Sequence, residues 1–342
     1  MKIPEPSITI QKLIDAHHES IAEPPRPHMG CSQLGHPCDR KLWLSFRWAV
    51  LPEFPGRVIR LFRRGQNEEE TVVTDLRAIG IDVRKTGSNQ VRVNFGSHVS
   101  GSIDAIIESG VPEAKTSRHV AEFKTHSKKS FDDLEKNGVE KSKFEHFVQM
   151  QLYMYGIDID RALYVAVCKD DDRIYTERIR LDKAIAEKYI ARGKRIALDN
   201  RMPPPLSTDP SWYQCKFCES YSFCHETKTT KQVNCRTCAH STAMPDSTWR
   251  CEYHGADDIP VDYQRTGCEG HVLHPDLVPW ERAEGIDEWT AVYIIDGKPV
   301  ANGEGDAHVY TSREILANPR MCTVNDEFVT EVRELFGARI DG

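Results

Sequence analysis

The chain has 342 residues, of which 28% are charged and 39% apolar, and its formal net charge is −7. This length allows more than one domain, and no apolar run is long enough to span a membrane. The acidic balance disfavours proteins that coat nucleic acid, because phosphate binding needs a basic surface. Basic residues are dense at 57–65 and 124–129, which still allows an acidic enzyme with a basic channel.

The N-terminal segment lacks the pattern of a secretory signal, which predicts a cytoplasmic setting, or the host cytoplasm if a phage encodes the protein. In that setting the 11 cysteines are expected to bind metals rather than to form disulfides.

Hydrophobic periodicity predicts an α/β core in which a central mixed sheet is flanked by helices. A hairpin at 289–305 and a helix at 325–337 are expected near the C-terminus. The other expected elements are helices at 8–19, 39–50, 57–79, 144–157 and 183–198, and strands at 91–95, 99–108, 119–126, 162–169 and 174–181.

Two predicted strands carry charged side chains in apolar surroundings. Glu122 and Lys124 are two apart on the strand at 119–126, so they face the same side of it. Asp104 lies among isoleucines on the preceding strand, where burying a carboxylate is costly unless it is paired or binds a metal. Two such strands could hold Mg²⁺, which prefers oxygen ligands. The alternative for Glu122 and Lys124 is an ion pair on a half-exposed strand.

A third acidic residue, Glu69, falls on the inward face of the helix at 57–79, whereas Glu68 and Glu70 point elsewhere. The alternative is that the whole acidic run is a solvated helix face. The expected apolar stripe of this helix consists of Phe62, Val72, Val73, Leu76 and Ile79.

The predicted buried helix at 144–157 carries Gln149 and Tyr153 four residues apart, on one face. A glutamine on an apolar helix needs a hydrogen-bond partner. It could be part of a site or simply a satisfied amide in the core.

Taken in order, these motifs resemble the PD-(D/E)XK nuclease superfamily, most closely its RecB-like and lambda-type phage exonuclease branch. The resemblance covers roughly residues 30–226, and Ile103 stands where the family often has proline. The motifs are G-x-x-x-E with Gly65 and Glu69, then Asp104, then E-x-K with Glu122 and Lys124, then Q-x-x-x-Y with Gln149 and Tyr153.

The resemblance implies a deoxyribonuclease that depends on Mg²⁺ or Mn²⁺ and is an exonuclease in phage-type DNA recombination or replication. Glu69, Asp104 and Glu122 would bind the metal, and Lys124 would orient or deprotonate the attacking water. Gln149 and Tyr153 would help to position the substrate strand. DNA would be the substrate, and a single-strand annealing protein would be a natural partner.

A first cysteine cluster has the spacing C-x2-C-x5-C, and its residues are Cys215, Cys218 and Cys224. A tetrahedral metal site needs a fourth thiolate, which Cys38 or Cys31 could supply. Spacing alone does not separate zinc from iron–sulfur. The layout resembles iron–sulfur members of the same superfamily, which implies a 4Fe-4S cluster with Cys38 as the fourth ligand, and zinc as the alternative.

A second cluster is typical of a zinc-ribbon-like module with a structural Zn²⁺. His254 and His271 each follow a cysteine by three residues and could replace one ligand. The expected ligands are Cys235, Cys238, Cys251 and Cys268.

The expected domains are a nuclease core closed by the iron–sulfur cluster at 1–226, a zinc module at 227–280 and a small α+β region at 281–342. One alternative to an exonuclease is a non-catalytic nucleic-acid-binding scaffold on a nuclease fold, and another is an endonuclease. The sequence leaves open polarity, strand preference, DNA against RNA, and oligomeric state.

Overall fold

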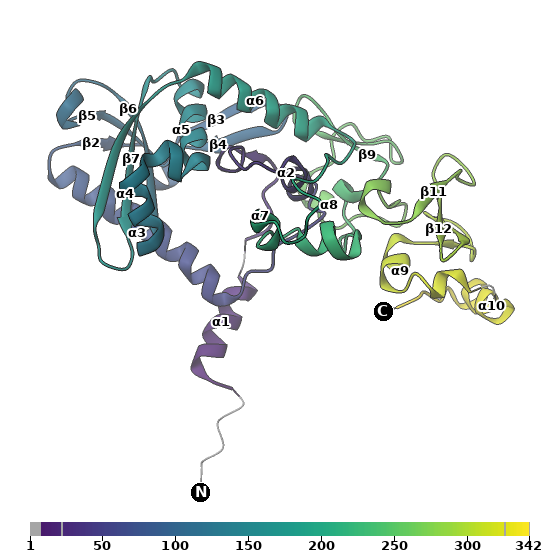
Figure 1. The fold of residues 1–342 in the computed structure, drawn as a ribbon. Coiled ribbons are helices and arrows are strands. Elements are labelled where there is room, and N and C mark those ends of the chain that lie inside the picture. Colours follow the sequence, from purple (N-terminus) through teal and green to yellow (C-terminus); the bar gives the residue numbers. More distant parts are fainter. Residues whose placement is uncertain (1–7, 22, 325, 342) are drawn as a thin grey trace, which may run out of the picture. The chain divides into compact units, whose positions relative to one another are not determined.

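A computed structural model describes residues 8–21, 23–324 and 326–341, and the chain forms two compact units (Figure 1). Unit 1 is made of Met1–His36, Pro52–Phe95 and Val99–Gly193, and unit 2 is made of Pro37–Leu51, Gly96–His98 and Lys194–Gly342. These units do not coincide with the three segments expected from the sequence, and that division stays a prediction. Residues 1–7, Ala22, Asn325 and Gly342 of the expected segments lie outside the described residues.

The centre of unit 1 is a five-stranded sheet with the order β2-β5-β6-β7-β8. β6 and β7 are parallel and the other neighbours are antiparallel, so the expected mixed sheet is confirmed. Apolar and β-branched residues dominate the three central strands, as buried strands require. The strands are β2 (Asp82–Arg84), β5 (Ala105–Ser109), β6 (His119–His126), β7 (Arg161–Cys168) and β8 (Ile174–Arg180).

Helices cover both faces of this sheet (Figure 1). On one face, Val72, Val73 and Leu76 of α3 (Gly56–Ala78) pack against side chains of β2, β5, β6 and β7. On the other face lie α4 (Lys128–Ser142) and α5 (Phe144–Gly156).

Two positions of the expected apolar stripe on α3 are wrong. Phe62 is 49% exposed and Ile79 is 73% exposed. Phe62 packs edge-on against Phe54, with 5.0 Å between ring centroids, and Ile79 is the C-cap that directly follows the last residue of α3. The helical period therefore predicts the buried middle of α3 correctly but not its ends.

The expected strand at 99–108 is two strands in different sheets. β4 (Val99–Ser102) joins a three-stranded sheet with β1 (Met29–Gly30) and β3 (Arg92–Gly96), whereas β5 joins the central sheet. Asp104 therefore lies at the bend between the two strands, and not within a strand. Its carboxylate accepts the backbone N–H of Phe123, on the neighbouring strand β6, at 3.0 Å.

Helix α4 is not among the predicted elements. Only three of its side chains are buried, so its apolar periodicity is weak among many charged residues, and Gly138 interrupts the helix with a φ of 72°. Helices α1 (Ile10–Ser20) and α6 (Lys183–Leu198) match their predictions closely. Of the helices in the described part of the chain, none has the length and apolar character that crossing a bilayer requires.

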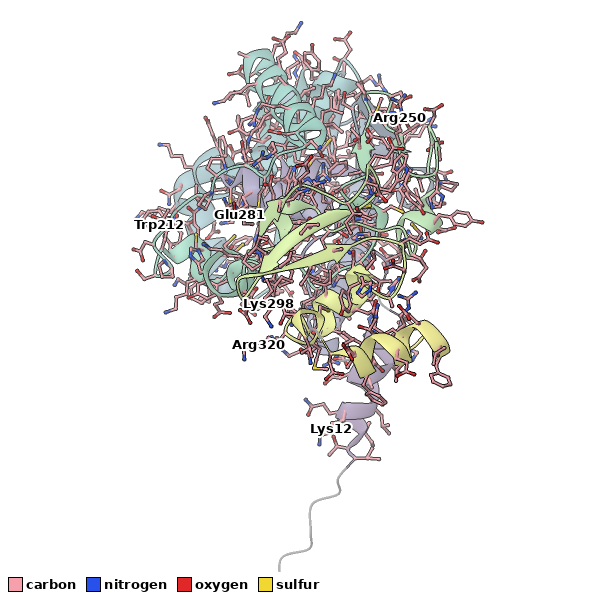
Figure 2. All side chains as sticks on the ribbon, turned by 90° about the vertical axis from the view of Figure 1, so that its right-hand side faces the viewer. Lys12, Trp212, Arg250, Glu281, Lys298 and Arg320 are labelled. Carbon is pink, nitrogen blue, oxygen red and sulfur yellow. The ribbon has the colours of Figure 1, made fainter. Side chains whose placement is uncertain are left out.

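The C-terminal part of unit 2 contains a four-stranded sheet with the order β11-β12-β13-β14. Glu281 and Lys298 of this sheet are labelled in Figure 2. The predicted hairpin is confirmed as β12 and β13, joined at Asp296 and Gly297, which have φ of 49° and 77° as a two-residue hairpin turn requires. The elements are β11 (Glu281–Ala283), β12 (Ala291–Ile295), β13 (Lys298–Asn302), β14 (Val309–Tyr310), α9 (Ser312–Ala317) and α10 (Glu327–Phe336).

The segment Pro37–Leu51, which contains α2 (Asp39–Phe46), is part of unit 2 although it lies far from the rest of that unit in the sequence. The expected helix ends at Phe46, and Trp48 follows with a positive φ of 52°. The buried guanidinium of Arg236 lies 3.7 Å from the centre of the Trp48 ring and donates to the Phe46 carbonyl at 2.8 Å. Stacking and hydrogen bonding thus fix this segment in unit 2.

Candidate active site and cysteine clusters

The candidate active site is built on β6, where Glu122 is fully buried. In the antiparallel pairing of β5 with β6, Ala105 lies opposite Ala121. Continuing this register by one residue places Asp104 opposite Glu122. The bend before β5 therefore brings the two predicted acidic residues together from neighbouring strands.

Lys124 joins these two carboxylates, as the same-face prediction for Glu122 and Lys124 requires. Its ammonium nitrogen forms an ion pair with Glu122 and lies 3.6 Å from Asp104 Oδ2. It also donates to the Phe123 carbonyl at 3.0 Å. Burial alone would lower the pKa of Lys124, but the charges of Glu122 and Asp104 outweigh it and raise this pKa, so the side chain is protonated at neutral pH.

The carboxylate of Glu122 is poorly satisfied. Within the described residues, neither of its oxygens accepts a well-aligned hydrogen bond, and the Lys124 ammonium contacts one of them. Burial, together with the charge of Asp104, raises the pKa of Glu122 to about 8. A buried carboxylate that lacks donors is the kind of group that a hard cation would satisfy.

Glu69 reaches the same group from α3. Burial and the charge of Asp104 raise the pKa of Glu69 to about 7, whereas the Lys124 ammonium acts in the opposite sense. These interactions place Glu69 near the strand carboxylates. Gly65, one turn earlier, has open space where a Cβ would lie, with Thr125 Oγ1 of β6 at 3.9 Å.

Gln149 and Tyr153 lie on the buried face of α5 and contact each other, since Gln149 Nε2 donates to the Tyr153 hydroxyl at 3.1 Å. The side-chain oxygen of Gln149 is buried and has no donor among the described residues. Burial, followed by the charge of Glu122, raises the pKa of Tyr153, so this side chain faces the acidic group. The neighbouring helical turn supplies a contrast, because both amide atoms of Gln151 are hydrogen-bonded and it is a satisfied core amide.

Three further polar side chains lie beside Lys124 and are not among the predicted site residues. Tyr164 of β7 is the register neighbour of Glu122, and its hydroxyl lies within hydrogen-bond distance of both His126 and His146. Spacing could have indicated the histidines, because His126 is two residues after Lys124 on β6 and His146 is three before Gln149 on α5.

In the first cysteine cluster, Cys38 acts electrostatically on Cys218 and Cys224. Burial raises the pKa of both thiols, and the nearby Cys38 thiol adds to the shift. Cys215 lies in the short helix α7 (Tyr213–Lys216), and its carbonyl accepts the Cys218 N–H at 2.9 Å. Cys31, the competing fourth ligand, is buried beside Gly101 and its pKa is raised to about 12 by burial.

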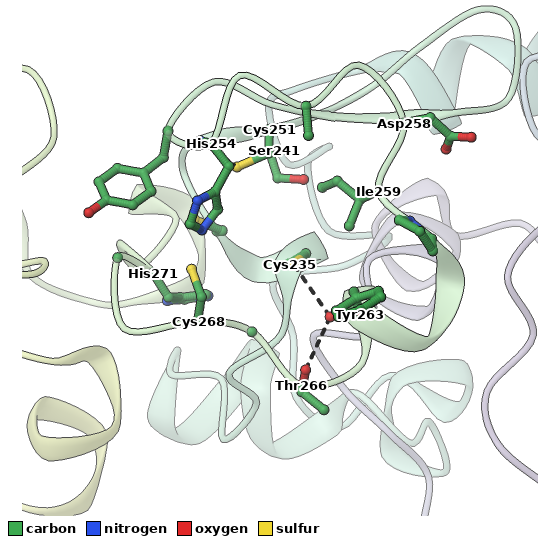
Figure 3. A pocket seen from close by; sticks show the side chains of 16 residues that line it. Cys235, Ser241, Cys251, His254, Asp258, Ile259, Tyr263, Thr266, Cys268 and His271 are labelled. Carbon is green, nitrogen blue, oxygen red and sulfur yellow. Dashed lines mark hydrogen bonds between the residues drawn. The ribbon is translucent and has the colours of Figure 1, made fainter.

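The second cluster lines one cavity of about 240 Å³ in unit 2 (Figure 3). Backbone donors point at two of its sulfur atoms, since Val272 N lies 3.5 Å from Cys238 Sγ and His254 N lies 3.5 Å from Cys251 Sγ. Such bonds favour the thiolate, which is the metal-binding form of cysteine. The cavity is lined by all four predicted ligands, Cys235, Cys238, Cys251 and Cys268.

The two histidines near this cavity differ. His271 has both ring nitrogens engaged, with Nδ1 2.7 Å from Ser312 Oγ and Nε2 3.1 Å from the Asn234 carbonyl. Both histidines line the cavity (Figure 3). The ring of His254 packs edge-on against Tyr253. Of the two alternative ligands, His271 is therefore the one whose ring nitrogens already have partners within the protein.

Taken over the described residues, no group of three or more histidine, cysteine, aspartate or glutamate side chains has an arrangement that could hold a metal ion. The acidic group and the cysteine cavity therefore bring suitable donor types together without forming a closed coordination shell.

No family model matches the chain, and no curated protein matches its sequence. Among solved structures, SSO0001 is 17% identical with a TM-score of 0.39, covering 62% of this chain and 92% of that one. The alkaline exonuclease LHK-Exo in complex with dAMP is 15% identical with a TM-score of 0.36, covering 54% and 90%; the same exonuclease is described as that of Laribacter hongkongensis.

A phage-related exonuclease from Haemophilus somnus is 20% identical with a TM-score of 0.28, covering 40% of this chain and 68% of that one. The chain thus has a distant structural similarity to phage-type alkaline exonucleases. These TM-scores are too low for the similarity to carry a functional argument, and the function has to be argued from the site itself.

The raised pKa of Glu122 predicts a loss of stability at high pH. The contribution of Glu122 to metal-free stability is complete below its ordinary pKa of 4.5 and is lost as the pH rises through about 8, because the fold then holds a buried, ionised carboxylate beside the charge of Asp104 with no well-aligned donor. Urea unfolding in the presence of a chelator measures this. We expect Glu122→Gln to flatten the loss, whereas Glu70→Gln, at an exposed position of α3, should retain it. A wild-type pH dependence in Glu122→Gln would show that another group is responsible.

Proposed function

We propose that this protein is a divalent-metal-dependent nuclease that hydrolyses phosphodiester bonds in DNA. The observation that carries the proposal is the fully buried Glu122 carboxylate, which has no well-aligned hydrogen-bond donor among the described residues and lies with Asp104 around the Lys124 ammonium. An apolar or amide side chain would be the more stable choice at such a position. A carboxylate here has a clear use if it binds a cation.

Glu69, Asp104 and Glu122 would hold Mg²⁺ or Mn²⁺, since all three supply hard oxygen donors from different elements. The bound ion would polarise the scissile phosphate and lower the pKa of a bound water. The neighbouring carboxylates keep the pKa of Lys124 raised, despite the opposing effect of burial, so Lys124 is better suited to orient the water and offset negative charge than to remove a proton.

Gln149 and Tyr153 are buried next to the acidic group, and their part in the proposed function follows from that burial. They are only 5% and 3% exposed, so they are poorly placed to contact a long DNA strand directly. The unpartnered oxygen of Gln149 could instead accept a hydrogen bond from water held by the carboxylates. Their part in positioning the substrate would then act through that water.

The exonuclease assignment, and with it a place in phage-type recombination or replication and a single-strand annealing protein as partner, derives from the order of motifs in the sequence. A non-catalytic scaffold would not need the buried Glu122. An endonuclease would use the same residues, and only its action on DNA without ends would distinguish it.

Cleavage of end-labelled linear DNA and of closed circular DNA, with and without Mg²⁺, tests the function. We expect degradation of the linear substrate only, and none with a chelator. Glu122→Gln and Asp104→Asn should each lower the rate by roughly a thousandfold, because a carboxylate of a shared cation site stabilises the transition state by several kcal/mol.

Glu69→Gln should also impair cleavage, whereas Glu68→Gln, its neighbour on the same helix, should remain close to wild type. Mg²⁺-dependent cleavage at the wild-type rate by Glu122→Gln would refute the site. Equal effects of the Glu69 and Glu68 substitutions would refute the part assigned to α3.

We further propose that the cysteine cavity holds a structural Zn²⁺ bound by Cys235, Cys238, Cys251 and Cys268. Its support is that all four thiols line one cavity and that backbone N–H groups point at two of them. Metal analysis should find about one zinc ion per chain in the wild type. Cys235→Ser should lose that zinc, and Cys322→Ser, at a buried cysteine outside the cavity, should keep it.

The cluster of Cys38, Cys215, Cys218 and Cys224 is proposed to hold a 4Fe-4S cluster, with zinc as the alternative. Protein purified without oxygen should then be brown and contain about four irons for each zinc. Cys218→Ser should remove the iron and leave the zinc of the other cluster. Two zinc ions and no iron in the wild type would contradict the iron–sulfur assignment.

A further inference from the structure

Four side chains beside Lys124 form a continuous hydrogen-bonded chain. Ser130 Oγ lies 3.3 Å from His126 Nδ1, and His126 Nε2 lies 2.8 Å from the Tyr164 hydroxyl. The same hydroxyl lies 2.9 Å from His146 Nδ1. The chain thereby links α4, β6, β7 and α5 at the candidate active site.

The position of this chain relative to Lys124 follows from strand geometry. Glu122, Lys124 and His126 alternate along β6, so all three face the same side, with Glu122 and His126 on opposite sides of Lys124 along the strand. Tyr164 lies next to Glu122 in the parallel register. A flexible lysine at this place has the carboxylates on one side and the hydrogen-bonded chain on the other.

Both histidines of the chain are neutral at physiological pH. Burial, supported by the ammonium groups of Lys143, Lys124 and Lys169, lowers the pKa of His126 to about 4. Burial, supported by Lys124, His126 and Lys143, lowers the pKa of His146 to about 3. The chain therefore places no positive charge next to the Lys124 ammonium.

The number of protons requires all hydrogen bonds among His126, Tyr164 and His146 to run in the same direction. A neutral imidazole has one N–H donor and one acceptor nitrogen, and the Tyr164 hydroxyl has one proton to donate. If Tyr164 donates to His146 Nδ1, it accepts from His126 Nε2, and both histidines carry their proton on Nε2. In the opposite direction both carry it on Nδ1. Either way, the two histidines share one tautomer.

We propose that His126, Tyr164 and His146 are positioning residues that hold the Lys124 ammonium against Glu122 and Asp104. Both ring nitrogens of His126, the Tyr164 hydroxyl and His146 Nδ1 are used in bonds within the chain, so these atoms offer the ammonium no competing acceptor. This inference rests on the proposed nuclease function and adds residues to its site.

Steady-state kinetics of the full-length protein tests the role. Tyr164→Phe and His126→Phe should lower kcat by about tenfold and leave KM for DNA unchanged, because they release Lys124 without touching the substrate. His126→Gln should restore most of kcat, since its amide nitrogen can take the place of Nε2. The matched control is Tyr155→Phe, at an exposed tyrosine of α5 whose hydroxyl donates to Glu187 at 3.3 Å, and it should behave as wild type.

NMR of the protein with isotope-labelled histidine gives a readout independent of cleavage. The signals of His126 and His146, identified by their loss in the two His→Gln variants, should show the same single neutral tautomer. In Tyr164→Phe each should become a mixture of tautomers. Opposite tautomers in the wild type would refute the chain.

The outcomes separate this inference from the function on which it rests. If wild-type protein cleaves DNA and Tyr164→Phe cleaves it at the same kcat, the positioning role is refuted and the nuclease remains. If wild-type protein does not cleave DNA under any metal condition, the proposed function is refuted and the positioning role with it, whatever the tautomers are.

Discussion

The carboxylate of Glu122 is the constraint around which the rest of unit 1 is arranged. It is fully buried and, among the described residues, has no well-aligned donor, so its charge is costly to the fold. The Lys124 ammonium offsets part of that cost, while Asp104 and Glu69 add further negative charge and raise it again. A site that increases its own electrostatic cost in this way is poorly explained by stability and well explained by cation binding.

In unit 2, buried guanidinium groups stacked on aromatic rings hold the segment Pro37–Leu51 in place. The guanidinium groups of Arg47 and Arg236 are each only 1% exposed, and both lie over the ring of Trp249, at 5.5 and 5.0 Å. Arg47 also donates to the Arg236 carbonyl at 3.2 Å. These contacts fix the segment that carries Cys38 without help from a metal. A metal at Cys38 would then stabilise a segment that protein contacts already hold in unit 2. Loss of one thiol therefore need not unfold the unit.

Local patterns predicted the elements of the site, and tertiary contacts decided their details. The period of two gave β6 with Glu122 and Lys124 on one side, and the period of 3.6 gave the middle of α3 and all of α5. The bend at Asp104 could not be predicted, because it depends on a hydrogen bond to Phe123 from the next strand. The stacking of Arg236 on Trp48 was equally hidden, since nothing in the sequence near either residue refers to the other.

The hydrogen-bonded chain beside Lys124 also combines a part that the sequence predicts with a part that only the structure reveals. His126 has the spacing from Lys124 that Glu122 has, so the alternation of β6 already assigns it to the site face. What makes it informative is Tyr164, which meets it only through the parallel register of β6 and β7. Register between strands far apart in sequence is set by the packing of the whole sheet. The alternation of residues within one β-strand can therefore indicate which side chains face a site. Which of these side chains bond to one another depends on how the β-strands pair.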